Sequence, residues 1–139
     1  MDPTFALAHF NLSDTYLAMG RYDLWLGEWK KGAALSNDKE DSMIADKVTE
    51  VYGRSGFHAA LVENAELLKQ LAKHRYVDPG HIGYRYATLG DKDQAFAWLE
   101  KAYAEKADSL QYIKTEFAVD ALRTDPRYAE LLKRMELPQ

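Results

Sequence analysis

Apolar residues recur at spacings of three and four along most of this chain. The stripe before Gly20 consists of Phe5, Ala8, Leu12, Tyr16 and Met19. This period is typical of an amphipathic helix that buries one face. The alternation that indicates strands is not sustained in any segment, so the pattern predicts an all-helical protein. The expected helices span 3–19, 21–36, 40–55, 57–75, 79–89, 91–106 and 125–136, and 109–124 is expected to hold one or two single helical turns.

Three glycines divide these helices into pairs. Gly20, Gly56 and Gly90 are 36 and 34 residues apart, and each lies between two helical patterns. Glycine takes positive φ at little cost, so it can end one helix and let the next reverse onto it. Asp-Pro steps at 2–3, 78–79 and 125–126 are suited to open helices, because Asp caps free amides and Pro fits the first helical position.

The pairs share small and aromatic residues at matching places. The third pair carries Ile82-Gly83, Tyr86, Gly90, Ala95, Leu99 and Ala102; the first carries Leu12-Ser13, Tyr16, Gly20 and Trp29; the second carries Val48-Thr49, Tyr52, Gly56, Leu61 and Ala65. This pattern resembles the tetratricopeptide repeat. Gly83 and Ala95 are expected to touch where the third pair of helices crosses. The first pair differs at Trp25, where the family has Ala, and we expect this bulky residue to splay that hairpin or to force a local repacking.

The resemblance implies an all-α fold, an α-solenoid of three hairpins with a C-terminal cap. The expected single domain 1–139 has repeats at about 3–37, 40–75 and 76–107 and a cap at about 108–139. An apolar stripe of Tyr128, Leu131, Leu132 and Met135 is expected to cover the last hairpin. Trp25 and Trp29, four residues apart, are expected to be buried, whereas Trp98 could be exposed or packed under 109–124.

Asp2-Pro3 lies where the end of a preceding repeat would fall, so the chain resembles a piece of a longer array. Its C-terminal part resembles the end of bacterial multidomain regulators. The expected localisation is therefore cytoplasmic, or periplasmic if the parent protein carries a membrane span. Removal of an upstream repeat would expose Phe5 and Leu7, which predicts possible self-association through this end.

Composition narrows the functional classes. The formal net charge of −4 and short basic stretches argue against nucleic-acid binding by this chain. The longest apolar run, Ala95 to Leu99, is far shorter than the roughly 20 residues of a membrane span. The absence of cysteine excludes disulfides, thiolate catalysis and cysteine-ligated metals.

Catalytic and metal-binding patterns are also missing from the sequence. The four histidines show no metal-ligand spacing, and no serine has the G-x-S-x-G context of a nucleophile. The segment 53–56 lacks the preceding strand and following lysine of a phosphate loop, and the acidic run 37–41 is expected to be a solvated loop. We therefore expect a protein that is not an enzyme and has no cofactor.

In tetratricopeptide arrays the first helix of each hairpin lines a concave groove. Applied to this chain, the resemblance implies a peptide-binding groove formed by Phe10, Asn11, Asp14, Leu17, Asp46, Lys47, Glu50, Arg54, His81, Tyr84 and Arg85. Mixed charges and aromatic groups suit binding of an extended peptide or partner helix. The sequence thus predicts a protein-interaction module. The alternative is a helical sensor domain that binds a small molecule between hairpins.

Overall fold

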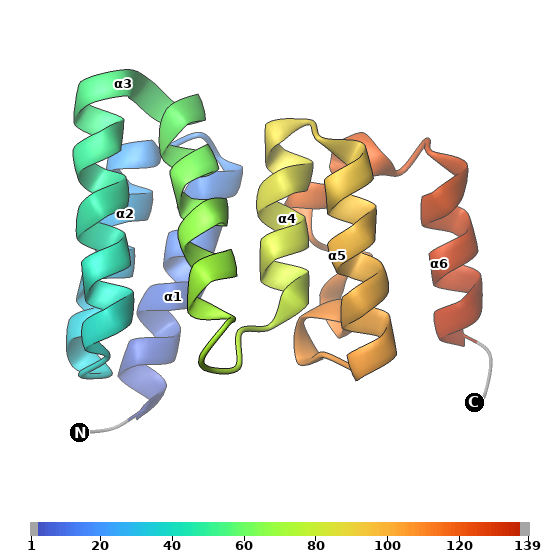
Figure 1. Ribbon diagram of the computed structural model, residues 1–139, viewed down its shortest axis with the longest axis horizontal. Coiled ribbons are helices and arrows are strands. Elements are labelled where there is room, and N and C mark those ends of the chain that lie inside the picture. The colour runs from blue at the N-terminus through green and yellow to red at the C-terminus, as the bar shows by residue number, and fades with distance from the viewer. Residues whose placement is uncertain (1–2, 137–139) are drawn as a thin grey trace. The chain divides into compact units, whose positions relative to one another are not determined.

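The computed structural model describes residues 3–136, and every regular element in this range is helical (Figure 1). The all-α fold class is therefore confirmed. The elements are α1 (Pro3–Ala18), α2 (Tyr22–Leu35), α3 (Lys39–Leu71), α4 (Pro79–Leu89), α5 (Lys92–Glu105), the 3₁₀ helices η1 (Asp108–Tyr112) and η2 (Phe117–Leu122), and α6 (Pro126–Glu136). The two short turns expected within 109–124 are η1 and η2.

The chain forms two compact units, Met1–Leu67 and Leu68–Gln139. Each unit is described by itself below. The assignment of 1–139 to one domain with three repeats and a cap stays a prediction.

In the first unit, α1 and α2 form a hairpin around Gly20, whose φ of +75° is the left-handed conformation expected there. The helices approach closely: the Ser13 hydroxyl donates to the carbonyl of Trp25 at 2.8 Å. A methyl group on Gly32 would lie 2.8 Å from the ring of Phe10, so a larger residue there would force this ring to move. The small size of Ser13 and Gly32 thus allows the two helices to pack tightly.

Trp25 and Trp29 are both buried, as expected. Their rings stack with centroids 6.1 Å apart, and Trp25 also meets Phe57 edge-on at 6.2 Å. Trp29 Nε1 donates to Asp41 at 3.0 Å, which joins α2 to the start of α3. Of the two expected outcomes, Trp25 does not splay the hairpin, because its backbone carbonyl is in hydrogen-bond contact with Ser13. Its bulky ring is accommodated by packing on Trp29 and Phe57.

Helix α3 contains both helices expected at 40–55 and 57–75, separated at Gly56. This residue has φ 88° and ψ −175°, a conformation essentially limited to glycine. Figure 1 shows that α3 turns back on itself, so we call residues 39–55 its first arm and 57–71 its second. Tyr22 of α2 stacks on Phe57 with ring centroids 3.6 Å apart, next to this reversal.

In the second unit, α4 and α5 form a hairpin around Gly90, which has φ +84°. A methyl group on Gly83 would lie 3.2 Å from the Ala95 carbonyl oxygen and from the Leu99 side chain. The expected contact between Gly83 and Ala95 is therefore confirmed. Asp91 caps α5 by accepting from the Gln94 amide at 3.1 Å.

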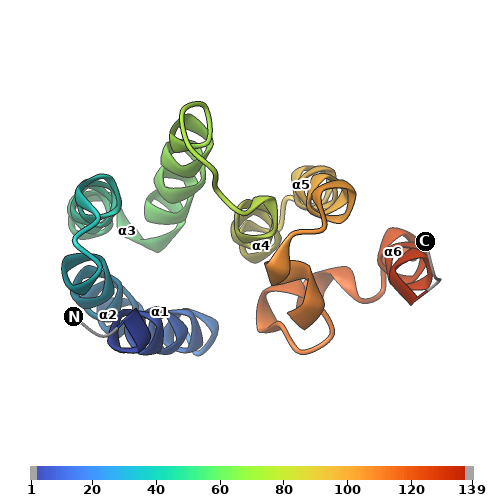
Figure 2. The same ribbon diagram turned by 90° about the horizontal axis from the view of Figure 1, so that it is seen from below.

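The η1–η2 segment packs on α4 (Figure 2). Asp78 caps α4 by accepting from the Gly80 amide at 2.8 Å, and the same carboxylate accepts from the Ser109 hydroxyl at 2.6 Å and the Ser109 amide at 3.0 Å. A methyl group on Gly80 would lie 1.9 Å from the Ser109 hydroxyl. One aspartate therefore both opens α4 and holds the segment that returns to it.

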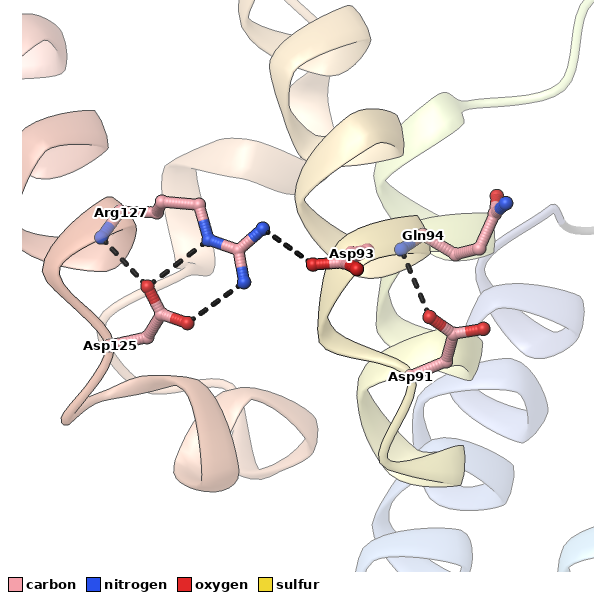
Figure 3. A network of polar contacts seen from close by, with 5 residues as sticks. All are labelled: Asp91, Asp93, Gln94, Asp125 and Arg127. Atoms are coloured by element: carbon pink, nitrogen blue, oxygen red, sulfur yellow. Dashed lines mark hydrogen bonds and ion pairs between the residues drawn. The ribbon is translucent and has the colours of Figure 1, made fainter.

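Helix α6 begins as the Asp-Pro pattern predicts. Asp125 accepts from the Arg127 amide at 2.9 Å and also from its guanidinium, which reaches on to Asp93 of α5 at 2.9 Å (Figure 3). Tyr128 and Leu131 are buried. The other two members of the expected apolar stripe, Leu132 and Met135, are half-buried.

The Gly83–Ala95 contact leads to a prediction about stability. We expect Ala95→Leu to lower the free energy of unfolding by about 1–3 kcal/mol, because the larger side chain cannot fit at the helix crossing. Ala97→Leu, at an exposed position of the same helix, is the matched control and should change it by less than about 0.5 kcal/mol. Chemical denaturation measures both values. Equal stability of the two variants would contradict the assigned helix crossing.

The Asp125–Arg127 pair leads to a prediction about pH. Hydrogen bonds from Arg127 lower the pKa of Asp125 to about 2, from an ordinary value near 3.8. The ionised carboxylate therefore stabilises the fold above about pH 4, and this contribution is lost as the pH falls toward 2. Asp125→Asn keeps a capping oxygen without the charge. We expect the melting temperatures of wild type and variant to differ at pH 5 and to converge near pH 2. A difference that does not change with pH would contradict this role for the charge.

Candidate functional site

The residues predicted to bind a peptide lie on α1, the first arm of α3, and α4, and thus in both units. On α1, Asn11 and Asp14 are exposed, whereas Leu17 is only 7% exposed. Phe10 is half-buried, with its ring against Gly32. The prediction that Leu17 lines a groove is wrong, because this side chain belongs to the core of the first unit.

All four residues predicted on α3 are exposed and carry alternating charges. We call Asp46, Lys47, Glu50 and Arg54 the charged strip. Glu50 lies 3.1 Å from Arg54 and 3.9 Å from Lys47, and Asp46 lies 3.6 Å from Lys30 of α2. Exposed pairs of this kind are worth only a few tenths of a kcal/mol each, so a ligand can replace them at little cost.

On α4 the three predicted residues have different environments. His81 is exposed and Arg85 is half-buried. Tyr84 is only 4% exposed, and its hydroxyl donates to the carbonyl of Ser109 at 2.8 Å. Burial raises the pKa of this tyrosine above its ordinary value of 10. The prediction that Tyr84 lines a groove is wrong, because η1 covers it.

The first unit also contains a partly buried hydrogen bond between the side chains of its two hairpin helices. His9 Nδ1 lies 2.5 Å from the Glu28 carboxylate. This hydrogen bond lowers the pKa of Glu28. The pair joins α1 to α2, so the role of His9 is to hold these two helices together.

The expected exposure of Phe5 and Leu7 is confirmed, at 61% and 57%. Met19, directly after the end of α1, is equally exposed. Self-association through these apolar side chains stays a prediction.

Two polar clusters of the second unit were not found from the sequence. One is the Asp78–Ser109 cluster, and the other joins Arg127 to Asp93. A signal for the second was present: Asp93 and Arg127 have opposite charges and are separated by 34 residues, the spacing between Gly56 and Gly90.

Within residues 3–136 no three His, Asp or Glu side chains are grouped so that they could hold a metal ion. In the same part of the chain, none of the helices has both the length and the apolar character required to cross a membrane. The chemistry that the charged strip offers is hydrogen bonding and ion pairing with a ligand.

Comparison of the chain with protein-family models, with curated proteins and with solved structures gave no match.

The burial of Tyr84 leads to a third prediction. Tyr84→Phe removes the hydroxyl that bonds to Ser109, so we expect the free energy of unfolding to fall by about 0.5–1.5 kcal/mol. Tyr112→Phe, at an exposed position of η1, is the matched control and should have almost no effect. Chemical denaturation of both variants measures the difference. If Tyr84→Phe were as stable as wild type, the hydroxyl would not hold η1 on α4.

Proposed function

We propose that this chain is a non-catalytic protein-interaction module built from tetratricopeptide-like hairpins. In this proposal an extended peptide or a partner helix binds the first unit through Asn11, Asp14 and the charged strip. The observation that carries the proposal is that these six polar side chains are all exposed, on helices whose other faces are packed.

The hairpin geometry supports the proposed repeat. Gly20, Gly56 and Gly90 each have positive φ at the reversal between two helices. Gly83 meets Ala95 at a helix crossing, and Ser13 meets Trp25 in the same way twelve residues apart. These are the places where a helical hairpin repeat requires small residues and sharp turns.

The character of the charged strip supports the proposed ligand class. Carboxylates and cations alternate along one exposed helix face, with no apolar residue among them. Such a surface can pair with both signs of charge and with the polar backbone of a peptide. Binding should be modest in affinity and weaken as salt rises from about 0.1 to 0.5 M, because exposed charges are screened over this range.

The experiment uses charge reversal. Peptides are first selected from a random display library on the immobilised wild-type protein, and their binding is measured by fluorescence anisotropy. We expect Lys47→Glu with Arg54→Glu to weaken binding of these peptides at least tenfold, with the melting temperature changed by no more than about two degrees, since exposed ion pairs add little stability.

The matched control is Lys73→Glu with Lys92→Glu, which changes the net charge by the same amount at exposed positions outside the strip. This control should bind like wild type. Equal affinity of wild type and the strip variant, or failure to select any peptide, would contradict the proposed site.

A further inference from the structure

Two sets of contacts join α6 to α5, and the first centres on Arg127. Its Nη1 donates to Asp93 at 2.9 Å, and its guanidinium lies 4.6 Å from the centre of the Phe96 ring. The arginine thus binds a carboxylate and an aromatic face of α5 at once, which suits its planar, charged group.

The second set repeats the first, seven residues farther along both helices. Arg134 Nη1 donates to Glu100 at 2.9 Å, its Nη2 bonds to the other oxygen of the same carboxylate, and its guanidinium lies 5.2 Å from the centre of the Tyr103 ring. Tyr103 in turn donates its hydroxyl to the Arg134 carbonyl at 3.4 Å. The pairing is bidentate, the strongest geometry between arginine and a carboxylate.

The two sets therefore share one register. In each, the paired acid and arginine are 34 residues apart, and a step of seven residues is close to two helical turns. The equal separations require α5 and α6 to run in the same direction, which Figure 1 shows. We define the acceptor face of α5 as Asp93, Phe96, Glu100 and Tyr103.

The attachment of α6 combines a small apolar anchor with accessible charges. Leu131 is fully buried and Tyr128 nearly so. Asp93 is 91% exposed and Arg127 45% exposed at the side chain, so their contact is accessible to water and screened by salt. Only residues 123–125 connect η2 to α6. The exchange proposed next requires α6 to leave this place while the α4–α5 hairpin stays folded.

We propose that the acceptor face of α5 is a docking surface for a helix with arginines seven residues apart, and that α6 of a second copy of this chain can occupy it. The second copy is the occupant because its α6 carries Arg127, Arg134 and the buried Leu131 in the required register. Reciprocal exchange keeps every α5–α6 contact and changes only the path of 123–125, so it yields a closed two-fold dimer.

Charge-swapped variants test this exchange. In one, Asp93→Arg with Glu100→Arg gives α5 the charge of its own α6; in the other, Arg127→Glu with Arg134→Glu gives α6 the charge of its own α5. Each variant alone should be monomeric, because like charges face each other within and between copies. The equimolar mixture should form a heterodimer of two 15.9 kDa chains, measured by sedimentation velocity.

The outcomes of the mixture separate this exchange from association through α1. All variants keep the exposed side chains of α1, so association through α1 would also give dimers of each variant alone. That result, or a mixture that stays monomeric, would overturn the proposal. The chain with all four substitutions is the matched control, because it restores opposite charges within one copy and should fold and associate as wild type does.

A second measurement keeps the proposal testable if a charge-swapped variant does not fold. The chain has no cysteine, so Lys133→Cys on α6 can carry a donor dye and Lys92→Cys on α5 of a separate population an acceptor. Mixing the two populations should give energy transfer that excess unlabelled wild type removes. No transfer in the mixture would overturn the proposal.

Discussion

The constraint on which the described hairpins depend is the close approach of two antiparallel helices. In the second unit this approach is close at Gly83, where a methyl group would lie 3.2 Å from the Ala95 carbonyl oxygen and from the Leu99 side chain. In the first unit the Ser13 hydroxyl bonds directly to the Trp25 carbonyl, and Phe10 lies over Gly32. Because the backbones are this close, each hairpin presents one set of side chains to the core and another to solvent, and the polar face considered for binding results from this division.

Local chemistry explains why the sequence predicts the helices well. Three helices begin where an aspartate side chain accepts a hydrogen bond from a backbone amide, at Asp78, Asp91 and Asp125. Two helices end at a glycine with positive φ, at Gly20 and Gly90. These signals involve neighbouring residues, so they can be found without a structure. The buried position of Trp25 could also be predicted, but the direction of its ring depends on Phe57, far away in the sequence.

Contacts between residues far apart in the sequence also explain why part of the predicted site was wrong. Tyr84 has the register of a surface residue, but Ser109, 25 residues later, returns to cover it. A helical period gives the face on which a residue lies, not which later segment packs against that face. The exposed residues of the charged strip were predicted correctly as surface positions, because their environment is set mainly by their own helix. The contact of Arg127 with Asp93 spans 34 residues and required the structure.

In the proposed function a ligand binds the first unit while α4 is covered by the chain's own η1–η2 segment. Amide hydrogen exchange with and without a selected peptide tests it most directly, because exchange reports protection segment by segment. We expect added protection in α1 and in residues 39–55, with α4 and 108–122 unchanged. Protection confined to α4, or loosening of 108–122 when the peptide binds, would contradict it.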